Sequence, residues 1–170
     1  MADTLIIVPP ARIEAIGSGS VMETIQEQII SAFVAAMSVI TIANGYNCNA
    51  GDNVFRCKKN LDPAELPAVV FWPGIETGER RASGYQYCDM KLGIEAHALF
   101  GSANPSVIAA KLLGDLIKAV FSQTITTLAD EIVYESGGTD TYPDAGEVAI
   151  GAKVTLSVKY YYLIGNPYSQ

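Results

Sequence analysis

Two stretches of the chain alternate apolar and polar residues over an unusual length. In the stretch 148–164 every even-numbered residue is apolar or aromatic, whereas the odd positions from 151 to 159 are small, polar or charged. A period of two is typical of a β-strand with one face on a core and the other toward a wetter surrounding. At about 3.4 Å per residue this strand would span roughly 55 Å, several times the usual five or six residues. We therefore expect part of it to reach beyond one compact domain.

The stretch 84–101 has the same pattern, with apolar residues at the even positions from 88 to 100. Two long strands of the same period favour pairing with each other. Such a pair would place Asp89 and Glu95 on the same polar face as Lys153 and Lys159, so that opposite charges can meet across the ladder. The register of the pair does not follow from the sequence.

A first helix is predicted over residues 21–37. Ser20 and Glu23 have the spacing of a capping box, and apolar residues follow at steps of three and four. Ile30 and Val34 widen the apolar stripe beyond what one sheet needs. We therefore expect this helix to make a second contact.

A second helix is predicted from the N-cap Asn104 and the first helical residue Pro105 onward. Its apolar residues between positions 109 and 120 form one stripe, which we expect to cover the sheet. Lys111, Asp115 and Lys118 are expected on the opposite, outer side.

The remaining elements are shorter. We expect strands at 67–73 and 131–135, a final helical turn at 124–129, a polar loop at 136–146, and a long Asn-rich loop at 43–66 in which only 54–58 resembles a strand. The order predicts an α+β fold: a mostly antiparallel sheet of about four to five strands with two helices packed on one face, and long strands that extend into a ring assembly. Residues 1–20 would be an N-terminal arm, 21–165 a single domain and 166–170 a C-terminal tail.

Composition and charge narrow the functional classes. Of the 170 residues 49% are hydrophobic and 17% charged, which excludes general disorder and suggests that other subunits cover part of the surface. The net charge of −7 argues against a surface that grips phosphate backbones. Arg80 and Arg81 are the most basic exposed point, either a solvated hairpin tip or a contact with an acidic partner or passing DNA. We expect no membrane span or signal peptide, and synthesis in the cytosol.

Candidate chemistry is sparse. His97 is the single histidine and has no partner at metal-ligand spacing, so we expect it to be a surface residue. Cys48, Cys57 and Cys88 form no CxxC pair, and Cys88 falls on the apolar side of its strand, where a thiol behaves as a small hydrophobe. Asp89 and Glu95 are about 20 Å apart by strand rise, too far for a paired acid and base. We expect no catalytic residue, metal or cofactor, and therefore no enzyme.

The combined pattern resembles the tail terminator, or tail completion, family of long-tailed bacteriophages. The resemblance covers about residues 20–168 and rests on the segments TIQEQIISAF, LPAVVFW, NPSVIAAKLLGDLIKAVF, LADEIVYESGG and GAKVTLSVKYYYLIGNPY. It implies a homohexameric ring in the virion, at the head-proximal end of the tail and assembled in the host cytoplasm. Such a ring sits on the tail tube protein, stops tube growth and docks the head-completion or connector protein. DNA passes through its lumen without specific binding.

Eight residues are our candidates for subunit or tube contacts: Ile6, Ile7, Ile30, Val34, Lys58, Lys59, Arg80 and Arg81. Two other functions stay open. One is a head-side stopper, adaptor or other minor tail protein, because small α+β domains of this kind can look alike in sequence. The other is a small cytosolic binding domain or enzyme with its ligand under the Asn-rich loop at 43–53, since long loops often bind ligands.

Overall fold

The computed structural model describes residues 22–81, 83–121, 125–141 and 148–170. These residues form one five-stranded sheet and two α-helices, which confirms the predicted α+β fold. The elements are α1 (Ile25–Met37), β1 (Val54–Arg56), β2 (Ala68–Arg80), β3 (Tyr85–Leu99), α2 (Pro105–Phe121), β4 (Ala129–Thr141) and β5 (Ala149–Leu163), with three short 3-10 turns at Ile42–Asn44, Ala50–Asp52 and Pro63–Glu65.

The strands lie in the order β1-β2-β3-β5-β4. β1 is parallel to β2, and every other pair is antiparallel. The two long strands predicted from the alternating pattern, β3 and β5, are neighbours along their whole length, from Tyr85 opposite Leu163 to Leu99 opposite Ala149. Their pairing forms the centre of the sheet, on which the other elements are arranged.

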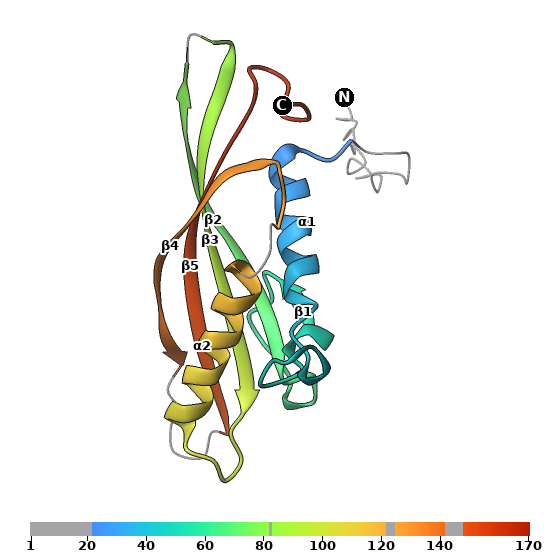
Figure 1. Cartoon of the computed structure of the whole chain (residues 1–170), viewed down its shortest axis with the longest axis vertical. Coiled ribbons are helices and arrows are strands. Elements are labelled where there is room, and N and C mark those ends of the chain that lie inside the picture. The colour runs from blue at the N-terminus through green and yellow to red at the C-terminus, as the bar shows by residue number, and fades with distance from the viewer. Residues whose placement is uncertain (1–21, 82, 122–124, 142–147) are drawn as a thin grey trace, which may run out of the picture.

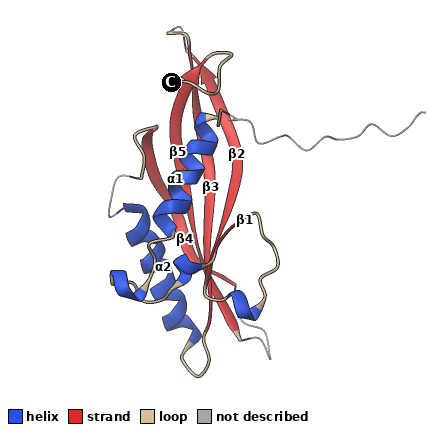
Figure 2. Cartoon of the chain, turned by 90° about the vertical axis from the view of Figure 1, so that its right-hand side faces the viewer, coloured by secondary structure: helices blue, strands red, loops and turns tan. Residues whose placement is uncertain are grey.

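Both helices cover the same side of the sheet, which we call the helix face (Figures 1 and 2). The even-numbered residues of β3 and β5 point to this side and pack with the apolar side chains of α1 and α2. The other side, to which the odd-numbered residues of β3 and β5 point, is called the open face. The largest fully buried side chains include Phe33, Phe71, Met90, Leu92, Leu116 and Tyr160. The period-two pattern therefore separates core from outer face as the sequence predicts.

The start of α1 differs from the prediction. Thr24 is the N-cap, and its hydroxyl oxygen accepts a hydrogen bond from Glu27 N at 3.1 Å. Ile25 N donates to Pro167 O at 2.9 Å, so the C-terminal tail satisfies one amide of the first turn. Thr24 and Glu27 have the same spacing as the predicted pair Ser20 and Glu23. Ser20 lies outside the described residues.

The second helix begins as predicted, and Ser106 N donates a hydrogen bond to Asn104 Oδ1 at 3.0 Å. The prediction that Asp115 lies on the outer side of this helix is wrong. Asp115 is 3% exposed. Its carboxylate accepts hydrogen bonds from Asn47 N at 2.9 Å and from Asn47 Nδ2 at 2.8 Å. The Asn-rich loop therefore packs over α2 and is held there by a buried carboxylate, a contact between distant segments that helical periodicity does not reveal.

Two strands are longer than predicted. β2 continues through Pro73 and Gly74 to Arg80, and β4 takes in residues 136–141, which were expected to be a loop. Both strands continue past the residues that predicted a strand end, because β-bulges interrupt their pairing there. The register of β2 shifts between Pro73 and Glu76, and the register of β4 shifts at several points. The described residues 125–128, predicted to be part of a final helical turn, are not helical.

The long strands continue past the end of the helix layer. Gln26, in the first turn of α1, lies beside Glu76 of β2, with Gln26 Nε2 at 3.3 Å from Glu76 Oε2. Beyond this level β2 and β3 continue as a projecting hairpin, and β5 stays paired with β3 as far as Tyr85 (Figure 1). Its turn closes with Gly84 N donating to Arg81 O, and Gly84 has a φ of 86°, which favours glycine. Neither described helix is long and apolar enough to cross a membrane.

Candidate interaction face

The centre of the open face is built around the carboxylate of Glu95. Lys153 is directly opposite Glu95 in the ladder, and Lys153 Nζ donates to Glu95 Oε1 at 2.8 Å. Trp72 Nε1 donates to the other oxygen at 2.7 Å, and His97 Nε2 lies 3.5 Å from it. Burial raises the pKa of Glu95, but the bonds from Lys153 and Trp72 outweigh it and hold that pKa below its usual value. Opposite charges therefore meet across β3 and β5 here, as the sequence predicts.

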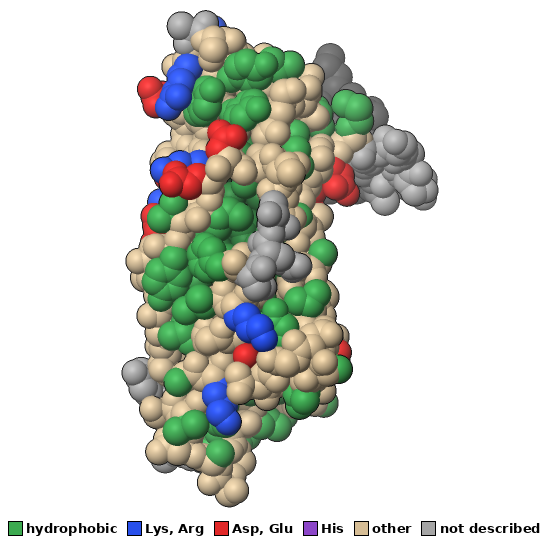
Figure 3. Space-filling model, in the orientation of Figure 1, with side chains coloured by type: hydrophobic (Ala, Val, Ile, Leu, Met, Phe, Trp, Pro, Cys, Tyr) green, Lys and Arg blue, Asp and Glu red, His purple; other side chains and the backbone are tan. Residues whose placement is uncertain are grey.

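A second group of paired charges lies toward the hairpin. Asp89 accepts a hydrogen bond from Ser157 Oγ at 2.6 Å, and Lys91 Nζ lies 2.5 Å from Glu135 Oε1. Lys159 is opposite Asp89 in the ladder, but its Nζ donates to Glu131 of β4 at 2.7 Å. Exposed pairs of this kind contribute little to stability, because water screens their attraction. Their main effect is to balance the charge of the open face, and Figure 3 shows acidic and basic side chains side by side along the upper left margin of the molecule.

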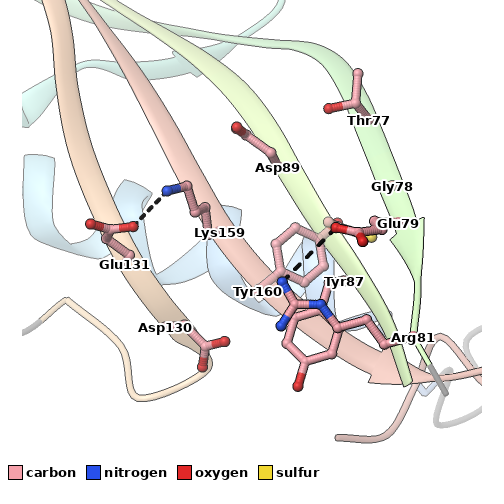
Figure 4. A pocket seen from close by; sticks show the side chains of 11 residues that line it. Thr77, Gly78, Glu79, Arg81, Tyr87, Asp89, Asp130, Glu131, Lys159 and Tyr160 are labelled. Carbon is pink, nitrogen blue, oxygen red and sulfur yellow. Dashed lines mark hydrogen bonds and ion pairs between the residues drawn. The ribbon is translucent and has the colours of Figure 1, made fainter. Parts of the chain in front are cut away.

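A hollow of about 530 Å³ lies on the open face between the hairpin and the start of β4 (Figure 4). Arg81 lies over the ring of Tyr87, with its guanidinium carbon 4.1 Å from the ring centroid. Tyr161 contacts Tyr87 and Tyr85 with ring centroids 5.6 Å and 5.2 Å apart. Asp130 borders the hollow from the β4 side. The hairpin therefore presents an arginine on an aromatic base, a combination enriched at protein interfaces.

A second hollow, of about 620 Å³, lies farther along the open face. The segment from Lys58 to Leu66 borders it on one side, and Trp72, His97 and Val148 line it as well. Lys58 is half-buried, pairs with Glu65 and lies over the ring of Phe55 at 4.3 Å. This hollow brings His97 close to the two lysines predicted to be contact residues.

On the helix face, one polar cluster was not foreseen from the sequence. The Tyr160 hydroxyl donates to Glu76, which the irregular pairing in β2 turns toward the helices. Burial, followed by the charge of Glu76, raises the pKa of the Cys88 thiol to about 11, and burial raises the pKa of Tyr160 as well. Cys88 is 4% exposed, which confirms the prediction that it behaves as a buried apolar residue. Glu76 reaches Tyr160 because of the bulge between Pro73 and Glu76, which no local sequence pattern predicts.

The structure separates the eight candidate contact residues. Arg80 and Arg81 are exposed at the hairpin end, and Lys59 is exposed beside the second hollow. Ile30 is 5% exposed and belongs to the core, and Val34 is half-buried against it. The wide apolar stripe of α1 is therefore used within the chain, where α1 contacts both β2 and α2. These two residues present little surface to a partner. Ile6 and Ile7 lie outside the described residues.

In the described part of the chain, no group of three or more His, Cys, Asp or Glu side chains is placed to hold a metal ion. No protein-family model matches the chain, and no curated protein matches it in sequence. What the geometry does provide is a charge-balanced sheet face, two hollows on it, and a hairpin that projects beyond the helices.

Proposed function

We propose that this chain is a structural virion protein, a phage tail terminator whose copies form a hexameric ring on the last ring of tail tube protein. The ring stops tube polymerisation and presents the docking surface for the head-completion or connector protein. DNA passes through its lumen without specific binding. The protein acts by assembly and carries out no catalysis.

One observation carries this proposal: the sheet extends past the helices that cover its core. Within β2, residues 68–71 are buried, whereas all residues from 74 to 80 are exposed. A strand with exposed residues and an unpaired edge is a template for pairing with another chain, and soluble domains usually keep such edges short. Neighbouring subunits in a ring would cover this part of the sheet, which explains why the sequence retains it.

The experiment is to remove the chain from the phage that encodes it and to image the resulting particles. A terminator is needed to end tube growth, so its loss should give filled heads beside unattached tails of irregular, overlong length. Restoring the chain should return tails to one length. Tails of normal, uniform length in its absence would contradict the proposal.

The same images test the alternative that the chain is a head-side stopper, an adaptor or another minor tail protein. Loss of a head-side protein leaves tails of normal length that fail to join heads. The length distribution of the tails therefore separates the two functions without any knowledge of the binding partners.

A small-molecule-binding domain is favoured by one feature, a hollow of about 320 Å³ next to the Asn-rich loop. Asn47 and Cys48 of the loop border it, together with Ile108, Lys111 and Leu112 of α2. Thermal-shift screening with nucleotides and metals tests this function, because a ligand at a hundred times its Kd stabilises a protein by about 2.7 kcal/mol. A large shift with one compound class would favour binding over assembly.

A further inference from the structure

We propose that the hollow of about 320 Å³ beside the Asn-rich loop binds a small organic anion, whose apolar body fills the hollow and whose carboxylate pairs with Lys111. Such a site does not depend on the ring, because a subunit of an assembly can also bind a small molecule. The lining residues define both the polarity and the charge of this ligand, which a general binding function leaves open.

Three parts of the chain that are far apart in the sequence form the hollow. The Asn-rich loop forms one wall, the first turns of α2 form another, and the end of β3 forms a third together with the segment before β2. Ala98 and Leu99 are near the last residue of β3, whereas the projecting hairpin begins at its first residue, Tyr85. The hollow therefore lies at the opposite end of the sheet from the hairpin.

Most of the lining is apolar. Ala98 and Leu112 are 8% and 2% exposed, Ile108 is half-buried against the core, and Leu99 is 44% exposed. An apolar group that enters the hollow would remove part of this surface from water, which favours binding. Sites for small ligands are mostly apolar with a few polar groups and measure about 300–1,000 Å³, so this hollow is at the small end of the range. The ligand body should consequently be small and apolar.

Lys111 is the one charged side chain among the described residues that line the hollow. It is exposed, and within the described part of the chain it has neither an ion-pair nor a hydrogen-bond partner. A free ammonium group beside an apolar hollow favours an amphiphilic anion, because the walls hold the apolar body and the ammonium binds the charge. One ammonium matches the single charge of a carboxylate.

Asp115, one turn along α2 from Lys111, does not line the hollow. Its Oδ1 accepts a hydrogen bond from Asn47 Nδ2, and its Oδ2 accepts one from Asn47 N and lies 3.7 Å from Cys48 Sγ. These contacts engage both oxygens of the acid and fix the wall that Asn47 and Cys48 form. Because this wall is held before any ligand arrives, binding does not require the loop to become ordered.

Three probes of similar chain length and different charge test the site: octanoate, octan-1-ol and octylammonium. Titration of the isotope-labelled full chain, followed by NMR, measures each Kd and locates the bound probe. We expect octanoate to bind most tightly and octylammonium least tightly, with the largest shift changes at lining residues such as Cys48, Leu99 and Leu112. Equal affinities for the three probes, or shift changes centred elsewhere, would overturn the proposal.

Substitutions at Lys111 separate the charge from the apolar contact. Lys111→Met should weaken octanoate binding by about fivefold, the upper range for one exposed ion pair, and leave octan-1-ol binding unchanged. Lys111→Glu should reverse the order, so that octylammonium binds more tightly than octanoate. Undiminished octanoate binding by Lys111→Met would contradict the assigned role of the ammonium.

Ala110→Glu is the matched control for Lys111→Met. Ala110 is exposed on α2 and does not line the hollow, and the substitution changes the net charge by the same amount. It should leave the three affinities and their order unchanged. An equal loss of octanoate binding in the two variants would mean that only the overall charge matters, which also overturns the site.

Thiol alkylation gives a second measure at the hollow itself. Cys48 lines the hollow, whereas Cys57 is exposed and does not line it. Saturating octanoate should slow the alkylation of Cys48 and leave that of Cys57 unchanged, because a bound molecule blocks access to the first thiol alone. Identical Cys48 rates with and without octanoate would place the probe outside the hollow.

The outcomes distinguish this site from the proposed function. Octanoate that fails to bind would remove the site and leave the ring, which is tested by the length of the tails. Tails of normal, uniform length in the absence of the chain, together with octanoate binding that depends on Lys111, would remove the ring and leave the site.

Discussion

Lys153 and Glu95 face each other directly across β5 and β3, with Lys153 Nζ 2.8 Å from Glu95 Oε1. The side chain of Glu95 is only 12% exposed, and Trp72 Nε1 donates to its second oxygen. The carboxylate is therefore bound on both oxygens in a partly desolvated position at the middle of the open face. Its charge should matter more for stability than that of the exposed pairs around it.

We predict that Glu95→Gln lowers the free energy of unfolding at pH 7 by about 1.5–3 kcal/mol, the usual contribution of a hydrogen bond to a charged group. The folded state lowers the pKa of Glu95, so its stabilisation is present above the unfolded value of about 4.3 and is lost as the pH falls through the folded pKa. The variant should consequently lose less stability than the wild type between pH 5 and pH 3. Urea unfolding at several pH values measures this.

Glu131→Gln is the matched control, since the Glu131 and Lys159 side chains are 55% and 48% exposed. Its effect on the free energy of unfolding at pH 7 should be much smaller than that of Glu95→Gln, because water screens an exposed pair. Equal losses in the two variants would show that the Glu95 cluster is no stronger than a surface pair.

A second prediction concerns the Asn-rich loop. Asp115→Ala removes the carboxylate that accepts both Asn47 N and Asn47 Nδ2, and leaves these donors unsatisfied in a part-buried site. We expect a loss of about 2 kcal/mol in the free energy of unfolding, with faster hydrogen exchange in the loop. Lys111→Ala, an exposed change on the same helix, should stay within about 0.5 kcal/mol of wild type. A neutral Asp115→Ala would mean that the loop is held by other contacts.

A third prediction is that one of the three thiols reacts quickly in the native protein. Cys57 is exposed, whereas Cys88 is buried and its pKa is raised to about 11. Only about one Cys88 thiol in a thousand would then be ionised at pH 8, and the thiolate is the reactive form. Cys48 is half-buried and its pKa is raised by burial, so it should react slowly too. Alkylation followed by peptide mass spectrometry measures all three rates, and fast labelling of Cys88 in native protein would contradict the packing of the helix face.

Much of this fold could be predicted because two patterns are strong and local. The alternation in β3 and β5 identifies the central pair, and the cap at Asn104 locates α2 to the residue. The length of β2 could not be predicted, because Pro73 and Gly74 normally end a strand and only the bulge lets β2 continue. The same bulge determines that Glu76 meets Tyr160.

The candidate interaction face was predicted in part. Alternation alone places Glu95 and Lys153 on one face of the sheet, whereas the register that puts them opposite each other comes from the structure. The partner of Lys159 depends on β4, whose register no pattern in the sequence specifies. Ile30 was proposed as a contact because its stripe is too wide for one sheet, and the second contact is α2 of the same chain. Sequence shows that a residue needs burial but does not show whether the covering surface belongs to the same chain.

Cryo-electron microscopy of tails from the phage that encodes this chain tests the central claim most directly. The account predicts a sixfold ring of this chain at the head-proximal end, between the last ring of tube protein and the connector, with the projecting β2–β3 hairpin within the assembly. Particles that contain no copy of the chain, or that hold it at a site away from this junction, would contradict it.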